Sequence, residues 1–174
     1  MESGANAGTD NVVLIGMRAS GKTTLGRALA ARLSLPLLDL DDEVGRLAGT
    51  TADALLAERG EAAFRAVEER ALREAVRRSR HVIAAGGGAV LHPEAFAALA
   101  ATGTVVYLQA ALDTLVQRAA LRPRPPLLPL PPEREIAALL ALRDPLYRAA
   151  AQIVVPVEGG DPILPLLVAL RKRV

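Results

Sequence analysis

A glycine-rich stretch near the start of the chain carries the clearest chemical signal. Residues 16–24 read GMRASGKTT and match the pattern G-x-x-x-x-G-K-[ST] without a mismatch. In such a loop, consecutive backbone N–H groups and the start of the next helix attract phosphate oxygens. Of the chain's 21 basic residues only Lys22 and Lys172 are lysine, and the slim Lys22 ammonium can reach phosphates where a planar guanidinium would be too bulky. The stretch therefore predicts binding of a nucleoside triphosphate.

The side chains of this loop suggest separate roles. The Thr23 hydroxyl is placed to bind Mg²⁺, the expected cofactor, and Lys22 is a catalytic candidate as well as a phosphate ligand. The side chain of Thr24 favours a structural role, although the residue belongs to the loop. The candidate ATP-binding residues of this stretch are Gly16, Ala19, Ser20, Gly21, Lys22, Thr23 and Thr24.

Two acidic residues near the next apolar segment suit a metal and an acceptor. The segment LPLLDL (35–40) is expected to be a strand and is followed by Asp41 and Asp42. Alternation in an extended chain would put Asp39 and Asp41 on the same side, where one supports the metal and the other faces an acceptor hydroxyl. The alternative is a charged cap at the start of the next helix, which suits Asp42 best. The first arrangement is typical of a kinase for small molecules.

The rest of the chain argues against two other classes of phosphate-loop protein. Guanine-specific proteins usually use N-K-x-D, and no second lysine lies in the interior of the chain. ATPase motors usually end a later strand in a carboxylate, whereas the later strands here are expected to end in Gly86-Gly87-Gly88 and in Gln109-Ala110. A small-molecule kinase remains the favoured class.

Short apolar segments alternate with helical patterns and must position these groups. Strands are expected at 11–15, 35–40, 81–85, 104–109 and 152–157. Helices are expected at 21–33, 42–48, 52–59, 60–79, 93–101, 111–121, 133–150 and 161–172. Because the strands are continuously apolar, we predict an α/β fold, in which helices cover both faces of a five-stranded parallel sheet in three layers.

A proline-rich segment interrupts this alternation. Residues 123–132 read PRPPLLPLPP and hold six of the chain's twelve prolines. Proline lacks the N–H that a helix interior or a central strand requires, so the segment is expected to be a loop. One interpretation is a simple connector. The other is a lid over about 120–133, suggested by Arg122 and Arg124.

Length and composition limit the remaining classes. The 174 residues are expected to form one domain over 11–174 after a polar tail at 1–10. A formal charge of +2 gives no reason to expect a nucleic-acid partner. The chain has no cysteine, no apolar run of about 18 residues and no signal-peptide pattern at its start, so we expect a cytoplasmic protein without membrane contact. His81 and His92 have no partners that would suggest a metal site.

Further motifs follow the phosphate loop in a fixed order. They are D-L-D-D (39–42), G-E-x-x-F-R-x-x-E (60–68), V-I-A-x-G-G-G (82–88), V-V-Y-L (105–108), L-x-x-R (115–118), an R-P and L-L pair in the proline-rich segment, and R-x-P-L-Y (143–147). Over nearly the whole chain, from Val12 to about Leu170, the combination resembles the shikimate kinase family. No single motif after the phosphate loop is specific, but together they are.

The resemblance implies a phosphoryl transfer with a defined acceptor. Members of the family transfer the γ-phosphoryl group of ATP, with Mg²⁺, to the 3-hydroxyl of shikimate. They have a nucleoside-monophosphate-kinase-like fold with a mobile lid, and the resemblance suggests a monomer. By this comparison Asp41 is the candidate base that contacts the acceptor hydroxyls, and Asp39 is the acid near the metal.

The same resemblance assigns the remaining acceptor ligands. Arg65 and Arg143 match the pair that grips the substrate carboxylate, for which a guanidinium fork is well suited. Gly86, Gly87 and Gly88 match the glycines whose backbone approaches the substrate ring. A charge in solvent is the alternative for Arg65, and a simple turn is the alternative for the glycines.

The adenine site and the lid fit the family less closely. Arg118 resembles the arginine that stacks on adenine, and Pro162 lies where the family often places a proline on the other face. The acid that the family commonly has after the final strand's valine is Pro156 here. The lid reads R-P-R-P-P-L-L instead of R-P-L-L, so Arg124 is our choice for the lid arginine, assigned to catalysis and ATP binding, with Arg122 as its rival.

Two other functions remain open at this point. One is a related kinase for another polyol acid such as gluconate, which the set Asp41, Arg65 and Arg143 with three glycines disfavours. The other is a non-catalytic domain that senses ligands while attached to a DNA-binding module. Only about ten residues precede the first expected strand, which argues against this alternative, whereas the altered lid is the one feature in its favour.

Overall fold

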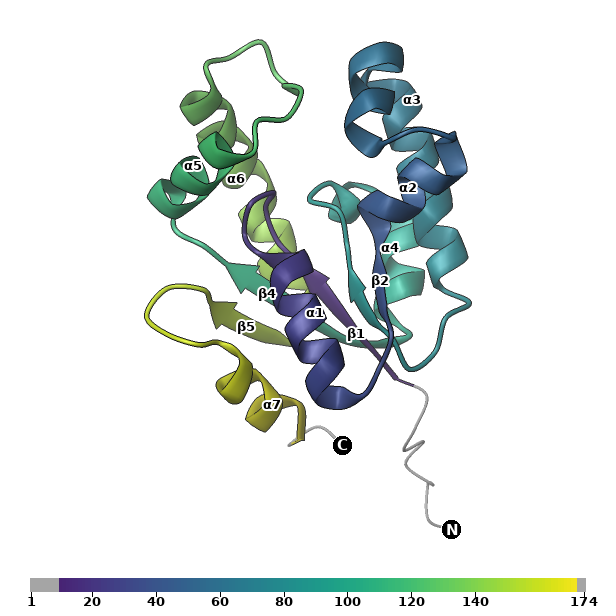
Figure 1. Cartoon of the computed structure of the whole chain (residues 1–174), viewed down its shortest axis with the longest axis vertical. Coiled ribbons are helices and arrows are strands. Elements are labelled where there is room, and N and C mark those ends of the chain that lie inside the picture. The colour runs from purple at the N-terminus through teal and green to yellow at the C-terminus, as the bar shows by residue number, and fades with distance from the viewer. Residues whose placement is uncertain (1–9, 172–174) are drawn as a thin grey trace.

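The computed structural model describes residues 10–171 and contains a five-stranded parallel sheet (Figure 1). The strand order is β2-β3-β1-β4-β5, and each adjacent pair is parallel. The strands are β1 (Asn11–Ile15), β2 (Leu37–Asp39), β3 (Val82–Ala84), β4 (Gly103–Gln109) and β5 (Ile153–Pro156). The predicted fold class is therefore confirmed.

Helices cover both faces of this sheet. Along β1, Val12 and Leu14 lie in a core cluster with residues of α1 and α7, while Val13 and Ile15 lie in a second cluster with residues of α3, α4 and α6. All of β1 is buried, which explains its continuous apolar sequence. The helices are α1 (Lys22–Leu33), α2 (Leu40–Ala48), α3 (Ala52–Ala75), α4 (Pro93–Ala100), α5 (Leu112–Leu121), α6 (Pro132–Ala150) and α7 (Ile163–Arg171), with a short 3-10 helix η1 (Ala89–Leu91).

The second strand is shorter than predicted, and this corrects the geometry expected for the acids. The prediction of a strand over 35–40 was wrong, because β2 covers only Leu37–Asp39 and α2 already begins at Leu40. Asp39 is the N-cap of α2, and its side chain accepts from the backbone N–H of Asp41. A side chain that satisfies a free first-turn N–H stabilises the helix start at that point. The cap is thus Asp39 and not Asp42, and Asp41 lies in the first helical turn.

Helix α3 joins two helices that the sequence predicts separately. Thr51 caps its start by accepting from the N–H of Ala54. The break expected before residue 60 is present as a kink, since Gly60 has a left-handed φ of 78° inside the helix. The helix then ends at Ala75, earlier than the predicted residue 79.

The proline-rich segment forms a loop over residues 122–131, between the end of α5 and the start of α6. Pro132 is the first residue of α6, where its missing N–H costs nothing. Figure 1 shows this loop at the same end of the molecule as α2 and the start of α3, with the phosphate loop between them. Among residues 10–171, no helix is both long and apolar enough to cross a membrane. The predicted tail at 1–10 lies outside the described residues except for Asp10.

Candidate active site

The phosphate loop connects the buried β1 to α1 and leaves the start of that helix open. Gly21 is the N-cap with a φ of 97°, and no side chain caps the helix. The first turn also carries no acidic residue. Its N–H groups are therefore free to bind an anion, and the helix dipole favours negative charge at this point.

Lys22 folds back over this loop. Its Nζ atom donates to the carbonyl oxygens of Gly16 at 2.9 Å and Met17 at 2.7 Å. Burial lowers the pKa of Lys22 to about 8, although Asp41 and Asp39 oppose the shift. The ammonium is thus short of compensating charge, which phosphate oxygens would supply.

Thr23 and Asp39 lie side by side next to the loop. The Thr23 hydroxyl donates to Oδ2 of Asp39 at 2.5 Å, while Oδ1 of the same carboxylate caps α2. One carboxylate therefore ends β2, starts α2 and reaches the phosphate loop. The arrangement brings two hard oxygen donors together, as predicted for a metal site.

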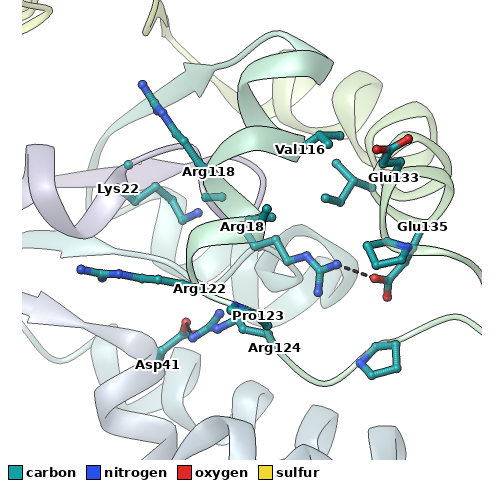
Figure 2. A pocket seen from close by; sticks show the side chains of 18 of the residues that line it. Arg18, Lys22, Asp41, Val116, Arg118, Arg122, Pro123, Arg124, Glu133 and Glu135 are labelled. Atoms are coloured by element: carbon teal, nitrogen blue, oxygen red, sulfur yellow. Dashed lines mark hydrogen bonds and ion pairs between the residues drawn. The ribbon is translucent and has the colours of Figure 1, made fainter.

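A cavity of about 920 Å³ lies above the loop (Figure 2). Arg118 is on its wall and donates from Nη1 to the Ser20 carbonyl at 3.2 Å. Of the predicted ATP-binding residues, Gly16, Ser20 and Pro162 are not among the lining residues. The predicted residues that do line it are Ala19, Gly21, Lys22, Thr23, Thr24, Asp39, Asp41, Gly87, Arg118 and Arg124.

A smaller cavity of about 50 Å³ lies beside it. Its walls include the predicted acceptor ligands Asp41, Arg65, Gly87, Gly88 and Arg143, but not Gly86. The two cavities share four lining residues, which are Arg18, Asp41, Gly87 and Arg124. The candidate base and the candidate lid arginine thus lie where the two cavities meet.

Arg65 is held in place by two glutamates. Its Nη1 donates to Oε2 of Glu68 at 2.6 Å, and its Nη2 to Oε1 of Glu61 at 3.1 Å. Glu68 is 3% exposed and also contacts His92 Nε2 at 2.9 Å. Glu68 is therefore a buried partner that fixes the guanidinium towards the small cavity.

The glycines at 86–88 have a role that the sequence does not reveal. A Cβ atom on Gly88 would lie 1.9 Å from Nη1 of Arg65, and one on Gly86 would lie 2.8 Å from Oε1 of Glu68. These two glycines therefore make room for the Arg65–Glu68 ion pair. The predicted approach of their backbone to a substrate ring stays a prediction.

Arg143 and Tyr147 both donate to the carbonyl oxygen of Gly87, Arg143 from Nη1 at 3.2 Å. Arg143 is 4% exposed, and its Nε has no partner among the described residues. Burial raises the pKa of Tyr147 to about 12, so the phenol stays protonated and remains a donor. The turn that carries Gly87 is thereby fixed to α6.

Arg124 reaches across from the proline-rich loop to the opposite wall. Its Nη2 lies 3.0 Å from Oδ2 of Asp41, and its Nε lies 3.1 Å from Oδ1 of Asp53. Burial opposes the charge, but Asp41 and Asp53 outweigh this effect and raise the pKa of Arg124. The rival Arg122 lines only the larger cavity. This geometry favours Arg124 as the lid arginine.

Sequence reasoning missed several residues of this region. Arg18 lies in a variable position of the phosphate loop and forms an ion pair with Glu135 of α6 (Figure 2). Glu135 is 1% exposed, so α6 contributes a second buried charge to this region besides Arg143. A basic residue inside the phosphate loop was the available signal for Arg18. Nothing local indicated Glu135 or Asp53.

Comparison with known proteins agrees with this geometry. A family model described as shikimate kinase matches residues 18–163. A shikimate kinase from Nitratidesulfovibrio vulgaris is 46% identical over 156 residues, which cover 87% of this chain and 88% of that protein. One from Pseudomonas syringae pv. tomato is 39% identical over 163 residues, covering 93% of this chain and 95% of the relative.

A solved structure points to the same family. The shikimate kinase from Acinetobacter baumannii in complex with shikimate superimposes with a TM-score of 0.85 at 34% identity, covering 94% of this chain and 92% of that one. Sequence, fold and the two adjoining cavities therefore agree, and the chain belongs to the shikimate kinase family.

Proposed function

We propose that this protein transfers the γ-phosphoryl group of ATP to the 3-hydroxyl of shikimate and yields shikimate 3-phosphate and ADP. The observation that carries the proposal is the junction of the two cavities. The larger cavity has the phosphate loop as its floor, and the smaller one has Arg65 and Arg143 on its walls. Asp41 and Arg124 line both, where a hydroxyl and a phosphate would meet.

Asp41 is the candidate general base at this junction. In the transfer, the acceptor oxygen forms a bond to the γ-phosphorus while the bond to the β,γ-bridging oxygen breaks and ADP leaves. The hydroxyl proton passes to the Asp41 carboxylate. Such a base contributes on the order of 10²–10⁴-fold to the rate. The Lys22 ammonium and the first-turn N–H groups of α1 stabilise the phosphate charge.

Arg65 and Arg143 are proposed to hold the acceptor carboxylate. Both line the small cavity, and both are anchored, Arg65 by Glu68 and Arg143 by the Gly87 carbonyl. Prior anchoring lowers the entropy lost when a ligand is gripped. A planar carboxylate can accept two parallel hydrogen bonds from each guanidinium.

The donor set also fits Mg²⁺ bound together with ATP. Thr23 Oγ1 and the Asp39 carboxylate are hard oxygen donors, and residues 10–171 contain no group of three or more His, Cys, Asp or Glu side chains that could hold a metal ion. Mg²⁺ usually takes one or two protein ligands and completes its shell with water and substrate phosphates. When bound, the ion would neutralise charge on the phosphates. Thr23 and Asp39 would hold it.

Arg124 is proposed to leave Asp41 when ATP binds. Nη2 of Arg124 donates to Oδ2 of Asp41, so the pair must open before that oxygen can accept the hydroxyl proton. The side chains of Arg124 and Asp41 are 38% and 30% exposed. Ion pairs as exposed as this contribute only about 0–1 kcal/mol to the stability of a conformation. Hydrogen bonds from a guanidinium to phosphate are about twice as strong as neutral ones. The phosphates can therefore draw Arg124 away.

An ADP-release assay with Mg·ATP and several acceptors tests the proposal. Shikimate, quinate, gluconate and nucleoside monophosphates would be compared at equal concentration. Turnover with shikimate well above the others is expected. Gluconate and the nucleoside monophosphates have no carboxylate on a ring, and quinate carries an extra hydroxyl on the carbon that bears its carboxylate. No turnover with shikimate, but turnover with another acceptor, would overturn the assignment.

Three further properties stay predictions. We propose that residues 11–174 act as one domain whose lid lies within residues 120–133, that the protein is a monomer, and that it works in the cytoplasm. Sedimentation at micromolar concentration checks the monomer, and a mass of twice 18.2 kDa would contradict it.

A further inference from the structure

Glu135 connects three parts of the site that are distant in sequence. Its Oε1 accepts from the backbone N–H of Leu127 at 2.5 Å and of Leu128 at 3.2 Å, and its Oε2 accepts from Nη2 of Arg18. The side chain of Glu135 is 2% exposed and that of Arg18 is 16% exposed. A carboxylate this deeply buried is retained only where its oxygens are satisfied, and here three donors do so.

The contacts of Glu135 divide the proline-rich loop. Leu127 and Leu128 are tied to α6, and the Arg122 N–H is tied to the Ala119 carbonyl at the end of α5. Only residues 123–126 lie between the two attachments, and three of these four are proline. Proline restricts φ, so this short stretch has few conformations. The part of the loop that can move is thus much smaller than the lid predicted over 120–133.

Arg124 is carried on this short stretch. It precedes Leu127 by three residues, and an extended chain spans about 3.3–3.6 Å per residue, so the Arg124 Cα stays within about 11 Å of Leu127. The position of Leu127 therefore limits where the Arg124 guanidinium can reach. Leu127 lines the small cavity, Glu135 the large one and Arg18 both. The network lies in the wall between them.

We propose that Glu135 is a positioning residue for the phosphoryl transfer. It fixes the second half of the lid to α6, and through Arg18 it ties that anchor to the phosphate loop, so that Arg124 is aimed at the junction of the two cavities. Glu135 itself contacts no reacting atom. The proposal deepens the proposed function and rests on it, since it assumes that Arg124 assists the transfer.

A double-mutant cycle tests this role. Glu135→Leu removes both acceptors, and kcat with shikimate is expected to fall about 10–100-fold, as for a misplacement on the order of 1 Å, with KM for ATP changed much less. In an Arg124→Ala background the same substitution should cost less than about threefold, because residues that act through one another are non-additive. Equal losses in the two backgrounds would show a general structural role and overturn the proposal.

Two further variants keep the test decisive. Arg148→Met breaks an ion pair with Asp144 on the same helix and outside both cavities, so its effect should be small and additive with Arg124→Ala. Should Glu135→Leu fail to fold, Glu135→Gln takes its place in the cycle. Its remaining oxygen still accepts from the two leucine N–H groups, while its amide meets Arg18 with a donor.

The activity of the wild-type protein distinguishes failure of the proposed function from failure of the role of Glu135. If the wild type releases no ADP with shikimate, the proposed function fails. If the wild type is active and the cycle is additive, only the role of Glu135 fails. Amide exchange followed by NMR gives an independent check, because Leu127 and Leu128 should be protected in the wild type. Exchange of these amides at the rate of free peptide would contradict the anchor.

Discussion

The Lys22 ammonium lies against two backbone carbonyls, with the carboxylates of Asp39 and Asp41 as its nearest opposite charges. Because burial lowers its pKa to about 8, the free site loses this proton at a pH well below that of ordinary lysine. Bound phosphates stabilise the charged form and raise the pKa again. Protonation and ATP binding are therefore linked, and each favours the other.

The linkage gives a defined pH dependence. Below pH 8 this group should leave KM for ATP unchanged, and above pH 8 KM should rise by up to about tenfold per pH unit until the pKa of the bound state is reached. Lys22→Arg is the control, because arginine stays charged throughout and its profile should be flat, although at a higher KM. A flat wild-type profile up to pH 9.5, or an equal rise in the arginine variant, would contradict the assignment.

Gly88 gives a second test of a single position. A Cβ there would lie 1.9 Å from Nη1 of Arg65, so Gly88→Ala must push the guanidinium away from Glu68. A displaced Arg65 guanidinium would lose its proposed hydrogen bond to the carboxylate of shikimate. Loss of a charged hydrogen bond costs about 1.5–3 kcal/mol, so KM for shikimate should rise about 10–100-fold while KM for ATP changes little. In an Arg65→Ala background the substitution should add nothing. An unchanged KM for shikimate would sink this explanation.

Local patterns predicted the single residues well and distant partners poorly. The phosphate loop was readable because its pattern and its place between a strand and a helix are contiguous in sequence. Asp39 does lie beside Thr23, although not through the extended geometry that the sequence suggested, and the role of the two residues as metal ligands stays a prediction. Glu135 could not be found, since its partner Arg18 is 117 residues away in sequence.

At the scale of elements, the proline-rich loop brings a cation to the far wall of the site. Arg124 contacts Asp41 and Asp53. Arg122 follows the last residue of α5 as its C-cap and lines only the larger cavity. The two arginines are two residues apart, so their substitutions form a matched pair. Only the one that reaches the transferred phosphate should affect the chemical step.

Comparing kcat for Arg124→Ala and Arg122→Ala separates these candidates. Arg124→Ala should lower kcat by about 10³-fold, in the range seen for arginines that stabilise a transferred phosphoryl group. Arg122→Ala should change KM for ATP more than kcat, because it borders the nucleotide cavity alone. A large loss of kcat in the Arg122 variant alone would reverse the assignment.

The sequence predicted the elements but misplaced one boundary that matters. The five strands and the helices between them follow from continuous apolar runs and helical spacing. The predicted end of β2 was wrong because the strand pattern was continued past Asp39. An aspartate before a run of helix-compatible residues is also a signal for a helix N-cap, which is the role of Asp39 here. The boundary expected between helices 52–59 and 60–79 coincides with the kink at Gly60, a residue type that readily adopts a left-handed φ.

At the scale of the whole molecule, the parallel sheet collects the site at one edge. The segments that follow the carboxyl ends of the neighbouring strands β2, β3 and β1 supply groups of the site. Lys22 begins α1, Asp41 lies in the first turn of α2, and Gly87 follows β3. Helices α5 and α6 with their loop, and α2 with α3, stand on either side of the phosphate loop (Figure 1). This placement follows from the strand order, and binding at the carboxyl edge is general for open α/β sheets.

The attachment of the proline-rich loop was only partly predictable, and its closure stays a prediction. The sequence indicated a lid from its prolines and arginines, but it gave no sign that Glu135 holds half of the loop to α6. That contact depends on the packing of three separate segments. Tertiary contacts of this kind decide how far a lid moves, and local composition does not contain them.

The central claim is that the junction of the two cavities directs the γ-phosphoryl group to one ring hydroxyl. Phosphorus-31 NMR with proton correlation on a reaction of the protein with Mg·ATP and shikimate tests it directly. The expected product is a phosphomonoester coupled to the ring proton at carbon 3, formed in step with ADP. Inorganic phosphate without an ester, or an ester on another hydroxyl, would contradict it.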